Sequence, residues 1–296
     1  MPKPFRGHIG VIQRNAVTSW TKLVPRPEIF LFGEEEGVAE IAAELRIGHL
    51  RDVAHNEFGT PLLDDLLRRA RAVTHAPVLC FANSDIILLQ EFLDAAASVA
   101  SRFPQFLAVA HRLNVAVQEP ISFDGDWSRS FRSGVLSRGV RGSHTAIDVF
   151  VFAPDLYSEV PPLAIGRAWI DQWLIKAARL KGVPVVDITR VAQAIHQNHE
   201  YSHIAGGQQG AYWGKEALRN LALYGGVPHA YTLLDVTHEL TPGGRIPRVR
   251  FRRQRFAVRE WLWRNCIERT APLRKRFGLR REALRRVRRN EPAAKV

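Results

Sequence analysis

Asn83, Ser84 and Asp85 are the residues of this sequence whose types and spacing best suit chemistry. They end the apolar run 77–82, and a second apolar run follows. A short apolar run bounded by turn residues is typical of a buried central strand in a parallel sheet. Ligands of such sheets bind at the carboxyl edge, where this triplet would lie. A carboxylate there can hold a divalent cation. The alternative is a turn that caps the next helix.

Two other polar clusters would lie on the same side of such a sheet. Gln13, Arg14 and Asn15 close the first apolar segment, and Glu34 and Glu35 follow the second. An arginine beside a strand end can pair with a phosphate, and an acid there can bind a ribose hydroxyl or a base. The alternatives are an exposed loop arginine and acids that only complement a helix dipole.

Asp171 is a candidate general base. It follows Ile170, with Trp169 and Trp173 two residues away on either side. A carboxylate that is partly removed from water can accept a proton near neutral pH. The alternative is an exposed helical aspartate paired with Arg167 one turn earlier.

Three histidines, His196, His199 and His203, fall close together. Their spacing matches no zinc motif, and no cysteine accompanies them. One of them can complete a divalent metal site begun by Asp85. The alternative is that they are hydrogen-bonded loop histidines.

The elements that must position these residues alternate between strand and helix. Such alternation predicts an α/β fold of Rossmann-like type, with a mixed, mostly parallel sheet and helices on both faces. The expected strands are 7–13, 28–32, 77–82, 106–110, 145–152 and 184–188, and the expected helices are 37–46, one opening at Thr60-Pro61, 90–102 and 168–181. Residues 118–143 are polar and irregular, which is typical of a functional loop.

The charge of the chain is unevenly distributed. The net charge is +13, yet residues 245–290 hold 18 Lys and Arg against 3 Glu, which leaves 24 basic and 26 acidic residues elsewhere. We therefore expect a near-neutral domain over 1–244 and a basic, Arg-rich helical tail over 245–296. Tryptophan and leucine among arginines suit an anionic membrane surface. Packing on the domain is an equal alternative, and nucleic-acid binding ranks third.

The remaining composition favours a cytoplasmic protein. No window approaches the roughly 20 apolar residues of a membrane span, and the amino terminus lacks the apolar core of a signal peptide. Cys80 and Cys266 form no disulfide or zinc pattern, and Cys80 is expected inside a buried strand.

Taken together, these motifs resemble nucleotide-sugar glycosyltransferases of the GT-A fold, close to glycosyltransferase family 2. The likeness covers roughly residues 7–215 and rests on motif order. The motifs are the polar residues after the first two strands, the helix start at 59–61, and Asn83-Ser84-Asp85 in place of the family's Asp-x-Asp. Asp171 stands where such enzymes often place their base, and the His-rich segment where some place a third metal ligand.

The resemblance implies that Asp85, with His196 or His199, binds the Mg²⁺ or Mn²⁺ that bridges a donor diphosphate. It implies Asp171 as the base of an inverting transfer from a nucleoside-diphosphate sugar to a glycan or lipid-linked hydroxyl. Expected donor-binding residues are Gln13, Arg14, Asn15, Glu34, Glu35, Asp64 and Asn83. The enzyme would be cytoplasmic, peripheral on the inner membrane face, and active in surface polysaccharide biosynthesis.

Three other functions remain open at this point. A sugar nucleotidyltransferase has a related sheet, but it would need a Gly-rich phosphate loop, and residues 13–16 contain no glycine. A nucleic-acid-binding protein would act through the basic tail. A catalytically inactive glycan-binding relative is the third.

Overall fold

The structure is a computed structural model that describes residues 1–199, 207–226 and 229–262. It divides into two compact units, Met1–Arg250 and Phe251–Val296. The division falls at Arg250, shortly after the composition change expected at residue 244. In the described part of the second unit, helix α9 spans Arg252–Leu262. No helix among the described residues is both long and apolar enough to cross a bilayer.

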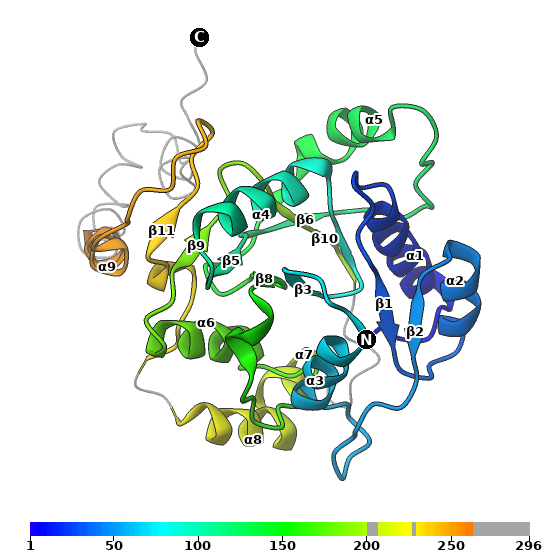
Figure 1. The fold of residues 1–296 in the computed structure, drawn as a ribbon, viewed down its shortest axis with the longest axis horizontal. Helices are drawn as coiled ribbons and strands as arrows, with labels where there is room; N and C mark the ends of the chain where they lie inside the picture. The colour runs from blue at the N-terminus through cyan, green and yellow to red at the C-terminus, as the bar shows by residue number, and fades with distance from the viewer. Residues whose placement is uncertain (200–206, 227–228, 263–296) are drawn as a thin grey trace, which may run out of the picture. The chain divides into compact units, whose positions relative to one another are not determined.

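Strands and helices alternate along most of the first unit (Figure 1). The helices are α1 (Gly7–Thr21), α2 (Val38–Leu45), α3 (Leu63–Val73), α4 (Gln90–Arg102), α5 (Trp127–Gly134), α6 (Ile170–Leu180), α7 (Gly207–Trp213) and α8 (Lys215–Tyr224), with short 3₁₀ turns η1 (Leu136–Arg138), η2 (Pro154–Tyr157) and η3 (Leu233–Asp235). The strands are β1 (Phe30–Phe32), β2 (Gly48–Leu50), β3 (Leu79–Ala82), β4 (Ile86–Ile87), β5 (Leu107–Val109), β6 (Arg112–Val115), β7 (Val140–Arg141), β8 (Val149–Phe152), β9 (Val185–Asp187), β10 (Ala194–Gln197) and β11 (His238–Glu239).

The main sheet has the order β11-β9-β5-β8-β3. Strand β8 runs antiparallel to both of its neighbours, β5 and β3, while β11, β9 and β5 are parallel. Because β3 and β5 both oppose β8, the strands β11, β9, β5 and β3 share one direction, which agrees with the expected mixed, mostly parallel sheet. Among the described strands β3 lies at the edge and not in the centre, and Cys80 on it is exposed. An apolar run alone does not distinguish an edge strand from a central one.

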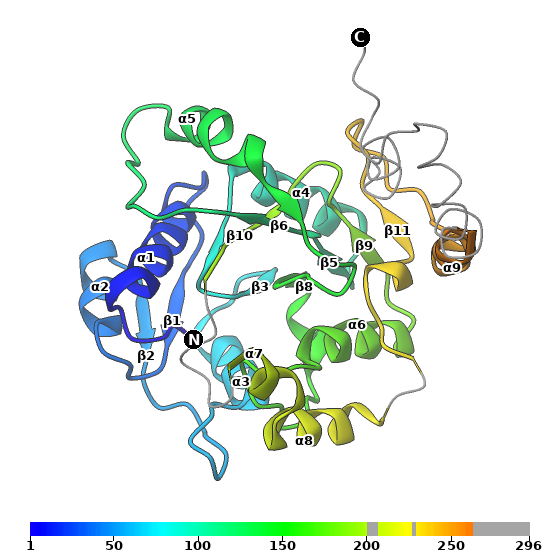
Figure 2. The ribbon, with the colours of Figure 1, turned by 180° about the vertical axis from the view of Figure 1, so that it is seen from behind.

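Helices cover both faces of the main sheet, as the sequence predicts. Phe150 and Phe152 of β8 pack in one hydrophobic cluster with α3 and α6. Val149 and Val151 alternate with them and pack with α4 on the other face. Figures 1 and 2 show α4 on one side of this sheet and α3 and α6 on the other. The continuous apolar sequence of β8 follows from this burial on both faces.

Two smaller sheets complete the first unit. One has the order β4-β10-β6-β7, in which β10 is parallel to β6 and antiparallel to β4. The other is the parallel pair β1-β2, which packs with α1 and α2. Helix α1 contacts β4, so it lies between these two sheets. The antiparallel pairing of β4 with β10 is the one that builds the candidate site.

Several elements differ from the sequence expectation. Residues 7–13 were expected to form a strand, but they begin helix α1. Its core side chains, Ile12, Ala16 and Ser19, follow the helical spacing, which two early glycines hide in the sequence. Segment 118–143 is not wholly irregular, because α5 and β7 lie within it. Helix α4, by contrast, spans the predicted residues 90–102.

Candidate metal centre

Strand pairing brings Asp85 beside the His-rich segment. Asp85 immediately precedes β4, and the register sets Ile86 opposite His196 of β10. Ile86 and Ile195 are almost fully buried, so burial fixes this register. The backbone N–H of Gln197 also donates to the Asp85 carbonyl over 3.3 Å. As a result, three ligand-type side chains meet at one end of β4.

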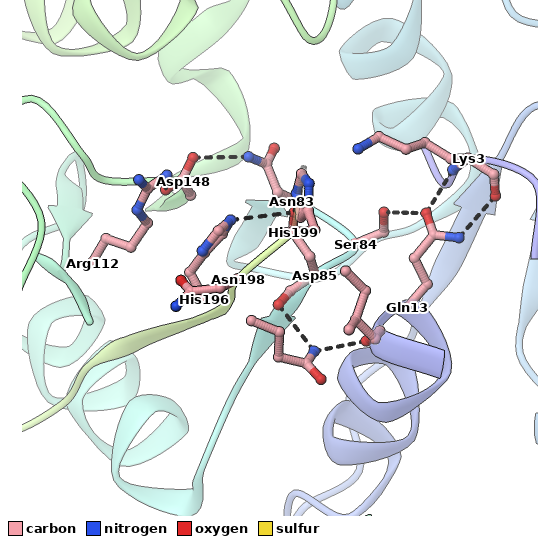
Figure 3. A network of polar contacts seen from close by, with 12 residues as sticks. Lys3, Gln13, Asn83, Ser84, Asp85, Arg112, Asp148, His196, Asn198 and His199 are labelled. Carbon is pink, nitrogen blue, oxygen red and sulfur yellow. Dashed lines mark hydrogen bonds and ion pairs between the residues drawn. The ribbon is translucent and has the colours of Figure 1, made fainter. Parts of the chain in front are cut away.

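Asp85, His196 and His199 form a compact cluster (Figure 3). The Oδ2 atom of Asp85 lies 3.0 Å from His199 Nε2 and 3.6 Å from His196 Nε2. Three ligand atoms, one from each residue, all lie within 4.8 Å of one another. The sequence left open which histidine belongs with Asp85, and the structure brings both of them to it.

The electrostatics of the cluster favour an ionised acid and a neutral imidazole. Burial by itself would raise the pKa of Asp85, but the His199 hydrogen bond and the charges of His196, His199 and Lys3 lower that pKa to about 2. Burial is the main cause that lowers the pKa of His196. Metal binding requires a deprotonated carboxylate and a neutral imidazole, and these pKa directions favour both.

The donor set also fits a bound cation. The Oδ1 atom of Asp85 and the Nδ1 atom of His196 are buried and have no hydrogen-bond partner among the residues that the structure describes. Unpaired buried polar atoms are costly, and a bound ion or ordered water satisfies such atoms at functional sites. A carboxylate with two imidazoles can hold a first-row divalent metal and leaves coordination positions for other ligands.

Asn83, two residues before Asp85, contacts a second polar group that consists of Asp148 and Arg112. Its side-chain amide donates to Asp148 Oδ1 over 2.9 Å, and Arg112 pairs with Asp148 Oδ2 over 2.9 Å. Asp148 has a positive φ of 59°, which is uncommon outside glycine and marks a constrained position. Asn83 therefore supports Asp148 within this structure. The expected contact between Asn83 and the donor stays a prediction.

Asp171 belongs to the same electrostatic neighbourhood. It lies in the first turn of α6, which begins after Trp169, a residue with φ of 83°. Burial, and then the negative charge of Asp148, raise the pKa of Asp171 to about 8, although Arg112 acts in the opposite direction. The alternative pairing with Arg167 is wrong, because that arginine pairs with Glu216. The sequence expectation of a partly desolvated carboxylate agrees with this arrangement.

Gln13 lies near Asp85, but its amide contacts protein groups. It is 2% exposed on α1. Its Oε1 accepts from the Lys3 backbone N–H over 2.6 Å and from the Ser84 hydroxyl over 3.0 Å. Its Nε2 donates to the Lys3 carbonyl over 2.8 Å. Gln13 therefore holds the amino-terminal segment against the residue that precedes Asp85.

Arg14 and Asn15 also have partners inside the protein. Arg14 pairs with Glu44 of α2. The Asn15 amide donates to Gln197 Oε1 over 3.1 Å, and its Oδ1 accepts from the Ile121 N–H over 2.9 Å. Both residues lie on a helix and not after a strand, which corrects their expected position.

The remaining expected donor residues line cavities whose linings do not include the histidine cluster. Glu34 and Glu35 line one of about 470 Å³ with His55 and Arg69. Asp64 lines another of about 690 Å³. The expected site residues thus fall into two groups: the candidate metal cluster, and the acids Glu34, Glu35 and Asp64, which line cavities that also contain arginines.

Sequence reasoning missed Lys3 and the pairing of Arg112 with Asp148. Lys3 precedes the first helix and carries no motif, so nothing in the sequence links it to Asp85. His203 and residues 263–296 of the tail lie outside the described residues, so the expectations about them stay predictions.

No protein-family model matches the chain, and no curated sequence matches it significantly.

Proposed function

We propose that this protein is a metal-dependent glycosyltransferase that uses a nucleoside-diphosphate sugar. The observation that carries the proposal is the largely buried cluster of Asp85, His196 and His199 at the end of a strand. The pKa of Asp171 is raised, and the negative charge of Asp148 is one cause of this shift. A cation at this cluster and a proton acceptor at Asp171 would meet two conditions of sugar transfer.

The cluster would hold Mn²⁺ in preference to Mg²⁺. Imidazole nitrogen suits Mn²⁺ better than Mg²⁺, which strongly prefers oxygen ligands and keeps its water. Asp85, His196 and His199 would hold the divalent cation, which would supply positive charge to offset that of the diphosphate leaving group. Asp85 supplies the ligand charge, while His196 and His199 add neutral donors.

Asp171 would act on the acceptor. An acceptor hydroxyl has too high a pKa to attack the anomeric carbon unaided, so a carboxylate must take its proton. Burial and the neighbouring Asp148 raise the pKa of Asp171, which makes its ionised form a stronger base than an ordinary aspartate. Direct attack by that hydroxyl inverts the anomeric configuration.

The test is a thermal-shift panel of nucleoside-diphosphate sugars with and without Mn²⁺. We expect at least one sugar nucleotide to raise Tm only when Mn²⁺ is present, because ligands that bind the native state stabilise it. Asp85→Asn should abolish that shift, while Asp155→Asn, at an exposed position on η2, should retain it. A shift that needs no metal, or that persists in Asp85→Asn, would contradict the proposal.

A further inference from the structure

The amino-terminal segment is held in a defined position on α1. Gln13 makes two hydrogen bonds to the backbone of Lys3, one to its N–H and one to its carbonyl. Gln13 itself is 2% exposed. A buried amide that satisfies both of its ends on one residue fixes the position of that residue.

Further contacts hold the same segment on either side of Lys3. The Phe5 N–H donates to the Glu36 carbonyl over 2.8 Å. A Cβ on Gly10 would lie 2.6 Å from the backbone carbon of Phe5, so this glycine permits close approach of the segment to α1. The Met1 side chain lies against Gly33. The backbone of Lys3 is therefore anchored by residues before and after it.

Gln13, which positions Lys3, also contacts the residue before Asp85. The same Gln13 oxygen that accepts from Lys3 also accepts from Ser84, the neighbour of Asp85. The charge of Lys3 is also among the causes that lower the pKa of Asp85, after the contributions of His199 and His196. Figure 3 shows the Lys3 side chain extending from this anchor on the side of Asn83 and Ser84.

The ammonium group is available to a ligand. Among the described residues, no hydrogen bond or ion pair engages Lys3 Nζ, although the residue is partly buried. Desolvation is the main cause that lowers the pKa of Lys3. A buried cation without a full partner is costly, and an anionic ligand would offset that cost.

We propose that Lys3 binds the diphosphate of the nucleotide donor, opposite the cation site formed by Asp85, His196 and His199. This inference rests on the proposed function. A divalent cation with one aspartate and two neutral imidazoles has a net charge of about +1. The diphosphate diester of a sugar nucleotide carries about −2. Lys3 supplies positive charge toward this balance, and as a point charge it binds phosphate without fixed geometry.

The test measures the binding of Mn²⁺ alone and of Mn²⁺ with pyrophosphate, by titration calorimetry at low salt on the full chain. Lys3→Met keeps the side-chain length and removes the charge. We expect it to weaken pyrophosphate binding about 10-fold or more, as is typical for a charge-assisted hydrogen bond. It should leave Mn²⁺ binding unchanged or make it tighter, because a like charge beside the cation is removed.

Two further variants complete the comparison. Lys3→Arg should retain most of the pyrophosphate affinity, and Lys22→Met, at the exposed end of α1, should match the wild type. If Lys3→Met binds pyrophosphate like the wild type, the role of Lys3 is wrong while the proposed function stands. If it weakens Mn²⁺ and pyrophosphate equally, Lys3 only supports the fold. If the wild type binds Mn²⁺ but neither pyrophosphate nor any nucleoside diphosphate, both proposals fail.

Discussion

At the scale of single residues, the candidate site combines an acid with a low pKa and an acid with a high one. The hydrogen bond from His199 and nearby positive charge hold Asp85 ionised, whereas burial and Asp148 favour the proton on Asp171. Environments that separate the pKa values of two carboxyl groups are the usual basis for different roles in one active site. Asp85 suits a metal, and Asp171 suits proton transfer.

Both cluster histidines should matter for metal binding. We expect His196→Ala and His199→Ala each to raise the Mn²⁺ concentration needed for half-saturation by about 10-fold or more, because each removes a candidate ligand. Electron paramagnetic resonance of free Mn²⁺ measures this directly. His75→Ala, at an exposed position, is the control and should bind like the wild type. Unchanged affinity in both cluster variants would remove the histidines from the site.

Asp171→Asn should lower turnover by about 10²-fold or more with donor binding unchanged, because it removes the base. In the wild type, activity should rise with pH and level off above about 8, since only the ionised carboxylate accepts a proton. The pH profile of kcat/KM with the donor found in the thermal-shift panel checks both expectations. A profile that is flat from pH 6 to 9 would assign Asp171 another role.

The raised pKa of Asp171 also predicts how stability depends on pH. The folded state holds a proton that an unfolded aspartate, with a pKa of about 3.9, releases. Stability from this group is therefore complete at low pH and is lost as pH rises toward about 8, with a slope of at most about 1.4 kcal/mol per pH unit. Asp171→Asn should flatten this part of the urea-unfolding curve against pH. An unchanged slope would show that the folded pKa is near normal.

At the scale of elements, short strand pairings and one helix assemble the site. The antiparallel register of β4 with β10 sets the histidines beside Asp85, and α1 supplies Gln13 behind it. Loss of α1 would therefore disturb the cluster without removing a candidate ligand. The close approach of the amino-terminal segment to α1 depends on Gly10.

Gly10→Ala should therefore destabilise the protein although alanine is the better helix former. A Cβ there meets the Phe5 backbone at 2.6 Å, and overpacking of this kind typically costs about 1–3 kcal/mol. Gly134→Ala, in α5, meets nothing within 4 Å and should be neutral or stabilising. Urea unfolding of the two variants checks the difference. Equal stability would mean that the segment moves aside at little cost.

At the scale of the whole molecule, the charge is concentrated in the second unit. Most of the basic excess lies between residues 245 and 290, while the sheets and their helices lie within Met1–Arg250. His238 of β11 bridges to Arg248, so the first unit needs the chain up to about that point. Because the basic residues and the hydrophobic core lie in different parts of the sequence, the two units can be tested separately.

A chain ending at Arg250 should remain folded and keep Mn²⁺ binding. The full chain should sediment with anionic vesicles at low salt and the shortened one should not, because basic residues near anionic lipid contribute about 1 kcal/mol each and salt screens them. Neutral vesicles are the control. Aggregation of the shortened chain would place the tail in the core, and RNA binding without vesicle binding would favour the nucleic-acid alternative.

The sequence by itself determined the elements whose patterns are local. The apolar stripe of α4, the alternation of strand and helix, and the polar triplet ending at Asp85 follow from residue types and spacing. The same local rules mistook the first turns of α1 for a strand and placed β3 in the centre of the sheet, because short apolar runs fit several environments.

Only the tertiary structure decided which side chains meet. Asp85 and His199 are 114 positions apart, and the β4–β10 register brings them together. Lys3 carries no sequence signal, yet Gln13 holds it beside Ser84. The pKa of Asp171 likewise depends on its burial and on Asp148, which directly precedes β8 and is distant in the sequence. Long-range contacts depend on burial and register across the whole core, which no local pattern records.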